Sequence, residues 1–209
     1  MMMSKVKTIV KKTWKPVVFS ICILIFIVLT KLLLSNQVES FDKFVYGIVS
    51  SIQNDYVTTL FKIITFFSGT YFIIGITVLI MILIKNKKTG FYIALNALLC
   101  CLLNQGIKFL VARPRPTDIN IIEESGFSFP SGHSMMSVAF YGLLVYFISK
   151  KRWKKNKKVL LSILLAILVF LIGISRIYLG VHYASDVFAG FALSAAYLIL
   201  FITIAFRKK

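Results

Sequence analysis

The residues best suited to chemistry fall in three short stretches of the chain. They are Lys108 with Arg115-Pro116 after a gap of six residues, the tetrapeptide Pro130-Ser131-Gly132-His133, and Ser175-Arg176 with His182 and Asp186. Together they supply three cations, two histidines and one carboxylate, all next to apolar segments of membrane-spanning character. Ionisable residues at membrane depth are costly and usually serve a function. We therefore expect the chemistry of this protein at these residues.

The three cations Lys108, Arg115 and Arg176 predict a site for phosphate. A single cation near a helix end is usually an anchor at the membrane surface. Three that converge would form a positive pocket in which the arginines bind a phosphate bidentately and the lysine acts as a point charge. Pro114 and Pro116 present Arg115 on a stiff, extended segment. The neighbouring Arg113 is interpreted as an interfacial residue and not as a ligand-binding one.

Residues 130–133 read as the start of a helix at an anion site. Ser131 is a typical N-cap, Gly132 allows close approach of the backbone, and the free N–H groups of a first helical turn attract anions. His133 then lies at the mouth of the site. The alternative, a hydrogen-bonded structural histidine, is the commoner role at a membrane boundary, but the neighbouring cations favour a functional one.

His182 and Asp186 are four residues apart and therefore share a face if both are helical. The carboxylate can accept from one ring nitrogen, fix the tautomer and leave the other nitrogen as a nucleophile. The simpler alternative is an N-cap or an interfacial pair. Together with His133 they are also suitable metal ligands. Three nearby cations would repel a metal ion, so we expect an anion site with no metal.

The elements that position these residues are expected to be membrane helices. The chain has 209 residues, 58% of them hydrophobic, and several apolar runs reach the roughly 20 residues that span a bilayer. We predict an all-α integral membrane fold in a single domain, residues 1–209, with one or two amphipathic helices at residues 35–67 lying in the outer interface. The six predicted transmembrane helices cover about 16–34, 68–84, 91–111, 131–149, 159–177 and 183–206.

The charge distribution predicts the topology. Four clusters at the ends of apolar runs hold 18 of the 25 Lys and Arg residues and none of the seven acidic ones. This is the pattern of cytoplasmic loops, not of a nucleic-acid-binding surface, in spite of the net charge of +18. Six spans put both termini in the cytoplasm and every candidate residue at the outer face of the plasma membrane. The three cysteines lie in apolar runs and indicate neither a metal site nor disulfides.

The three stretches resemble the three-part motif of the type 2 phosphatidic acid phosphatase superfamily. Lys-x6-Arg-Pro, Pro-Ser-Gly-His and Ser-Arg-x5-His-x3-Asp occur in order, with no departure at a family-defining position. The likeness extends from the second span onward. Size and layout are similar to those of bacterial membrane lipid phosphatases, such as phosphatidylglycerophosphate phosphatase B and the undecaprenyl-diphosphate phosphatases.

The resemblance implies roles for these residues and a class of substrate. His182 would attack phosphorus and form a phosphohistidine, Asp186 would hold its ring, and His133 would protonate the leaving group. Lipid phosphates or diphosphates would be the substrates, namely undecaprenyl diphosphate, phosphatidylglycerophosphate or phosphatidic acid, with undecaprenyl diphosphate favoured. No cofactor is implied, and the sequence leaves the oligomeric state open. The residues implied to stabilise the phosphate oxygens are Lys108, Arg115, Arg176, Ser131 and Gly132.

Three other functions are compatible with parts of this pattern. A phosphotransferase would pass the phosphate from the histidine to another lipid or sugar. Haloperoxidase chemistry, known in the same superfamily, fits poorly with a membrane-embedded chain of 209 residues. A lipid or anion transporter would have no need of two histidines and an orienting carboxylate.

Overall fold

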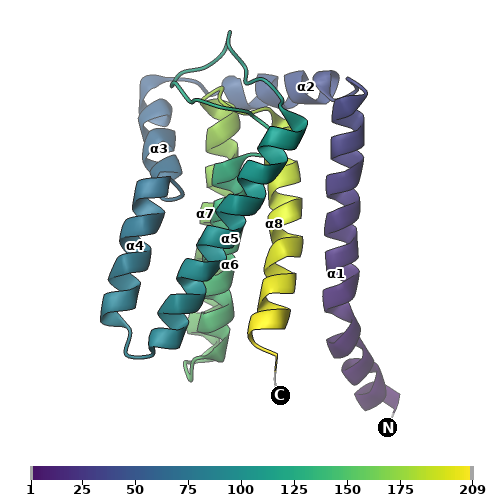
Figure 1. Ribbon diagram of the computed structural model, residues 1–209, viewed down its shortest axis with the longest axis vertical. Helices are drawn as coiled ribbons and strands as arrows, with labels where there is room; N and C mark the ends of the chain where they lie inside the picture. The colour runs from purple at the N-terminus through teal and green to yellow at the C-terminus, as the bar shows by residue number, and fades with distance from the viewer. Residues whose placement is uncertain (1, 208–209) are drawn as a thin grey trace.

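The computed structural model describes residues 2–207, with side chains from residue 14 onward. This part of the chain folds into helices and connecting loops (Figure 1). The helices are α1 (Met2–Leu34), α2 (Glu39–Ser50), α3 (Asp55–Phe66), α4 (Thr70–Leu83), α5 (Lys87–Val111), α6 (Gly132–Lys150), α7 (Lys155–Tyr178) and α8 (Ala184–Ala205).

Five helices, α1 and α5 to α8, are long and apolar enough to cross a membrane within the described residues. A sixth crossing is formed if α3 and α4 are taken together, because they pass the same test as a pair bent by 46°. The structure therefore confirms the predicted all-helical fold of a multi-pass membrane protein.

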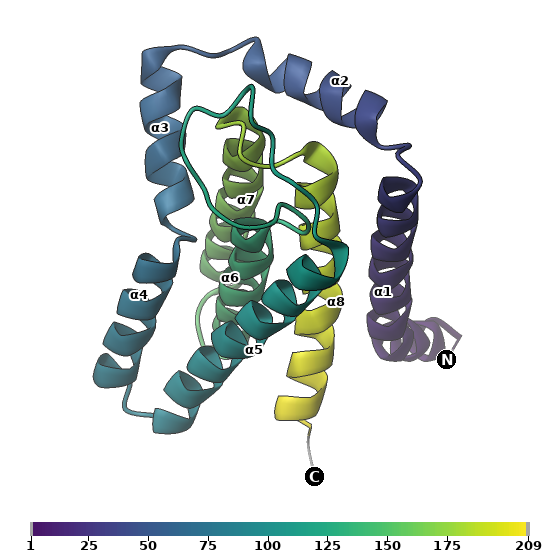
Figure 2. The same cartoon turned by 45° about the horizontal axis from the view of Figure 1, so that its top comes forward.

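The α3–α4 pair differs from the expected layout of residues 35–84. We predicted that the whole segment 35–67 would lie in the interface and that 68–84 would form a span alone. The 14 residues of α4 extend only about 21 Å, less than the roughly 30 Å of a hydrocarbon core. Instead α3 and α4 follow one another along the side of the bundle with a 46° bend between them, and α2 lies across the end of the bundle (Figures 1 and 2). The Tyr141 hydroxyl donates to the Phe67 carbonyl at the break, at 2.6 Å.

The helix α6 lies at the centre of the bundle and packs on α5, α7 and α8. Its buried residues Phe140, Tyr141 and Leu143 form one core cluster with Ile172 of α7. The helix α1 packs against α8, and α3 packs against α7. This packing fixes the ends of α5, α6, α7 and α8 next to one another, although they are far apart in the sequence.

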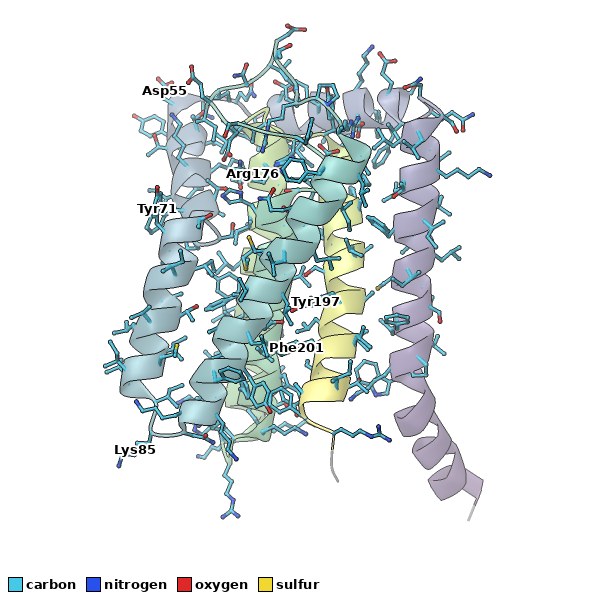
Figure 3. All side chains as sticks on the ribbon, viewed as in Figure 1. Asp55, Tyr71, Lys85, Arg176, Tyr197 and Phe201 are labelled. Carbon is cyan, nitrogen blue, oxygen red and sulfur yellow. The ribbon has the colours of Figure 1, made fainter. Side chains whose placement is uncertain are left out.

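One end of the bundle carries the connections that contain the candidate residues. The 112–131 loop curves over the ends of α6, α7 and α8, and α2 runs beside it (Figure 2). Asp55 and Arg176 lie towards this end, whereas Lys85 lies at the opposite one (Figure 3). The start of α1 and the end of α8 also lie at the end of Lys85 (Figure 1). The start of α1 and the end of α8 therefore lie at the end of the bundle opposite the candidate residues.

Candidate active site

The structure brings the three predicted stretches together at one end of the bundle. Lys108 comes from the last turn of α5, Arg115 from the 112–131 loop, and Arg176 from the last turn of α7. His182 lies in the turn that joins α7 to α8, and the remaining candidates open α6 and α8. Helix ends are natural places for such residues because their backbone groups are only partly paired.

His182 is held so that its two ring nitrogens face different groups. Its Nδ1 lies 3.4 Å from Asp186 Oδ2 and 3.3 Å from the Ser128 hydroxyl. Its Nε2 lies 3.1 Å from NH1 of Arg115. A guanidinium can only donate, so Nε2 accepts and the proton of the neutral ring belongs on Nδ1. Burial lowers the pKa of His182 to about 4, against the opposing effect of Asp186. The arrangement yields a neutral imidazole with its lone pair on Nε2.

Asp186 is fully buried, and both of its carboxylate oxygens accept hydrogen bonds. Oδ2 accepts from the backbone N–H of Tyr183 at 2.9 Å and from the Ser128 hydroxyl, in addition to facing His182. Oδ1 accepts from NH1 of Arg113 at 2.6 Å. A carboxylate bonded at both oxygens cannot rotate, so Asp186 fixes the plane of the His182 ring.

The cations Lys108 and Arg115 are tied to carbonyl groups of the 112–131 loop. Lys108 Nζ donates to the Phe127 carbonyl at 2.5 Å. Arg115 donates to the carbonyls of Ser125 and Gly126 at 3.1 and 3.0 Å. These bonds curl the loop around the two cations and leave their charge uncompensated by an adjacent carboxylate, apart from Glu124 at 3.9 Å from Arg115.

Arg176 is 1% exposed, and its guanidinium group contacts two residues. NH1 donates to the Thr65 hydroxyl of α3 at 2.8 Å, and NH2 pairs with Glu124 at 2.5 Å. Its Nε is a buried donor for which the described part of the chain offers no acceptor. An orphaned buried donor is unfavourable. The group is suited to an anion that enters the site.

The start of α6 forms as predicted. The Ser131 hydroxyl caps the helix by accepting from the Ser134 N–H, at 3.4 Å, and the Ser131 N–H donates to the Asp186 carbonyl at 3.0 Å. A Cβ at Gly132 would lie 3.0 Å from the amide oxygen of Asn104, so a larger residue here would require Asn104 to shift by a few tenths of an ångström. The cap takes the Ser134 N–H. The N–H groups of Gly132 and His133, which have no acceptor within the helix, are available to an anion.

His133 makes no side-chain hydrogen bond to any residue from 14 to 207. The charges that act on its ring come from the predicted cations and His182, which places it in the same electrostatic environment as the rest of the site. Its Nε2 lies 4.0 Å from where a Cβ on Gly69 would be, at the break between α3 and α4. A histidine free of structural hydrogen bonds is suited to proton transfer.

Sequence reasoning missed five residues that the structure adds to the site. They are Asp42, Thr65, Arg113, Glu124 and Ser128. Arg113 was assigned to the interface, whereas the structure buries it between Asp42 and Asp186 at 2.8 and 2.6 Å. Thr65 lies 111 positions from Arg176, so no local pattern could have indicated the contact. The sequence shows that the 112–131 loop contains acidic residues, but it does not show that Glu124 is the one that pairs with Arg176.

A cavity of about 570 Å³ adjoins these residues, with Arg115, Glu124 and Val181 in its lining. Across the described residues, no group of three or more His, Cys, Asp or Glu side chains is arranged to hold a metal ion. Of the candidate residues, Arg115 lines this cavity, beside Glu123 and Glu124, while the two histidines, Lys108 and Arg176 lie outside its lining.

Comparison with known proteins agrees with this geometry. The model of the PAP2 superfamily matches residues 88–209. The chain is 32% identical to phosphatidylglycerophosphatase B of Bacillus subtilis (strain 168), over 89% of this chain and 93% of that protein. It is 25% identical to undecaprenyl-diphosphatase of Sulfolobus acidocaldarius, over 84% of this chain and 85% of that protein. A crystal structure of a transmembrane PAP2-type phosphatidylglycerolphosphate phosphatase from Bacillus subtilis superposes with a TM-score of 0.84 at 29% identity, covering 91% of this chain and 97% of that one.

Proposed function

We propose that this chain, which belongs to the PAP2 superfamily and is a membrane lipid phosphatase, releases phosphate from its substrate through a phosphohistidine on His182. The observation that carries the proposal is the state of that ring. Nδ1 faces Asp186, Nε2 accepts from Arg115 at 3.1 Å, and burial lowers the pKa to about 4. A neutral nucleophile in a cationic pocket is what attack on a phosphate requires. The whole chain, residues 1–209, serves as one domain for this reaction.

In the first step the Arg115 NH1 group moves its hydrogen bond from Nε2 to a phosphate oxygen, which frees the Nε2 lone pair. His182 Nε2 then attacks phosphorus, and the bond from phosphorus to the leaving oxygen breaks. The positive charge that develops on the ring is stabilised by Asp186 next to Nδ1. His133 in its protonated form gives its proton to the leaving oxygen. Lys108, Arg115 and Arg176 stabilise the phosphate oxygens, and the electrostatic contribution of such groups usually dominates phosphoryl transfer.

In the second step water replaces the histidine on phosphorus. His133, now neutral, accepts a proton from the water as its oxygen attacks. The bond between phosphorus and Nε2 breaks, which returns His182 to its neutral form and releases inorganic phosphate. The first-turn N–H groups of α6, with Ser131 and Gly132, line the anion site. The proposed mechanism uses no metal or cofactor.

The proposed substrates are phosphatidylglycerophosphate and undecaprenyl diphosphate. The relative at 32% identity and the solved structure carry the first name, and the relative at 25% identity carries the second. The sequence alone favours undecaprenyl diphosphate, and the names of the relatives support phosphatidylglycerophosphate as a second candidate. In both lipids the phosphate lies at the membrane surface, where the site lies at the end of the bundle. The basic clusters at the opposite end support an orientation with both termini in the cytoplasm and the site outside.

The test is phosphate release by purified protein in detergent, with EDTA present, from phosphatidylglycerophosphate, undecaprenyl diphosphate and phosphatidic acid. We expect release that survives chelation and disappears in His182→Ala. The kcat/KM values rank the lipids. Release that is lost with EDTA, or that persists in His182→Ala, would overturn the mechanism. A product that forms only when an acceptor lipid is added would identify phosphotransfer instead.

A further inference from the structure

We propose that Arg113 and Asp42 are positioning residues for the reaction, because they hold Asp186 in the one orientation that presents His182 for attack. The inference rests on the function proposed above. Neither residue belongs to the three-part motif, and neither points into the anion site. They act through Asp186.

Arg113 binds the side of Asp186 that faces away from His182. NH1 donates to Asp186 Oδ1 at 2.6 Å, while Oδ2 faces His182 and accepts from Ser128 and the Tyr183 N–H. One oxygen is thus reserved for the guanidinium and the other for the nucleophile. Without Arg113, Oδ1 loses its partner, and the carboxylate is held only through Oδ2.

Arg113 is itself held in place from three directions. NH2 donates to Asp42 Oδ2 at 2.8 Å, and NH1 also donates to the Ser185 hydroxyl at 2.8 Å. The guanidinium carbon lies 3.8 Å from the centre of the Tyr183 ring, a cation–π contact. The side chain is 11% exposed. Such a buried, bridging guanidinium is fixed in direction and cannot serve as a mobile surface anchor.

Asp42 connects this assembly to the helix α2. Its Oδ1 accepts from the backbone N–H of Ser185 at 2.7 Å and its Oδ2 from the Ser185 hydroxyl at 2.9 Å. Asp42 therefore caps the first turn of α8, the turn that carries Asp186. It is 4% exposed although the helix around it lies at the surface. The amphipathic helix α2 thereby contributes one charged side chain to the geometry of the site.

The charges make Arg113 relevant to the proton on His182 as well as to its orientation. Arg113 lies between two carboxylates and partly neutralises Asp186. If the cation is removed, the negative charge next to Nδ1 is less compensated and the imidazolium form is stabilised. The pH below which the free enzyme loses activity should then rise. The other charged or titratable groups that act on His182 are Arg115 and Glu124 of the 112–131 loop, Arg176 of α7 and His133 of α6.

The experiment compares Arg113→Gln, Arg113→Lys and Asp42→Asn with the wild type in full-length protein, using the lipid that the wild type hydrolyses best. Glu39→Gln is the matched control, because Glu39 is on the same helix and pairs only with Lys43, with both side chains over 70% exposed. The readouts are kcat, KM and the pH dependence of kcat/KM, each referred to the amount of folded protein measured by thermal unfolding.

We expect kcat to fall by roughly 100-fold in Arg113→Gln and roughly tenfold in Asp42→Asn, with KM changing less than about twofold. Arg113→Lys should recover part of the loss because it restores the charge but cannot bridge both carboxylates. The acid limb of kcat/KM should move to higher pH in Arg113→Gln. A purely structural role predicts less folded protein with unchanged kcat and pH profile in what remains, and that result would overturn the proposal.

The design separates this inference from the function on which it rests. His182→Ala is measured in the same series. Loss of release in His182→Ala together with unaltered kinetics in Arg113→Gln and Asp42→Asn would reject the positioning role alone. Full release in His182→Ala would reject the phosphohistidine mechanism, and with it the inference.

Discussion

Gly180 provides a test of how tightly the turn before His182 is packed. Its φ is +68°, and a Cβ at this position would lie 2.0 Å from the Ile119 carbonyl oxygen and 2.9 Å from the Asn120 Cα. The two segments are also joined by the hydrogen bond from the Ile121 N–H to the Leu179 carbonyl, at 2.9 Å. An alanine therefore cannot be accommodated unless the turn and the 112–131 loop move apart by about 1 Å, since carbon and oxygen atoms in contact are normally over 3 Å apart.

The expected loss in Gly180→Ala follows from this displacement. The left-handed backbone alone costs a residue with a side chain about 1 to 2 kcal/mol. A shift of about 1 Å at His182, two residues on, misaligns Nε2 and costs roughly 100-fold in kcat. Gly126→Ala is the control: its φ is +76° as well, but no heavy atom lies within 4 Å of its Cβ position. Gly126→Ala should lose only the stability that the left-handed backbone costs, and it should retain nearly all of kcat.

The assay is phosphate release from the lipid, with thermal unfolding of both variants in the same detergent. We expect both variants to lose some stability and only Gly180→Ala to lose kcat. Equal kcat values in the two variants would refute the reasoning, because the clash with Ile119 is the feature that separates them.

Three further predictions concern the site itself. Burial lowers the pKa of His182 to about 4, and only the neutral ring is a nucleophile. The acid limb of kcat/KM, corrected for substrate ionisation, should therefore lie near pH 4, and an acid limb near 6.5 assigned to His182 contradicts this. Burial would raise the pKa of Glu124, but its pairing with Arg176 lowers it, so the carboxylate stays ionised and competes with phosphate for Arg176. Glu124→Gln should therefore bind inorganic phosphate about fivefold more tightly, as measured by inhibition kinetics. Weaker binding of phosphate would refute this competition. Ser128→Ala removes a hydroxyl that bonds Asp186, and kcat should fall roughly tenfold; an unchanged kcat would remove Ser128 from the site.

The clustering of the candidate residues could be predicted from the sequence because these residues have unusual types for their surroundings. Lys108 and Arg176 are charges next to apolar runs, and His182 and Asp186 have helical spacing. The structure places them together because α5 and α7 both pack on α6 and end at the same side of the bundle. Their catalytic roles stay predictions until the kinetics are measured.

The supporting residues could not be predicted because their partners are distant in the sequence. Asp42 reads as a polar residue of an amphipathic helix, and only the fold shows that it meets Ser185, 143 positions away. Arg113 resembles an anchor because it follows a membrane helix. The α3–α4 pair was missed because the charges between residues 39 and 55 argue against a span. Most of these charges lie in α2, and Asp55 is the first residue of α3.

The most direct measurement of the central claim is to trap the intermediate on His182. Enzyme mixed with a lipid substrate labelled at its terminal phosphate is denatured within milliseconds, and the bound label is tested for the acid lability of phosphohistidine and mapped by mass spectrometry. The account predicts label on His182 and none in His182→Ala. In His133→Ala the labelled enzyme should accumulate if hydrolysis of the phosphohistidine is slowed more than its formation. Rapid turnover with no covalent label, or label on any other residue, would contradict it.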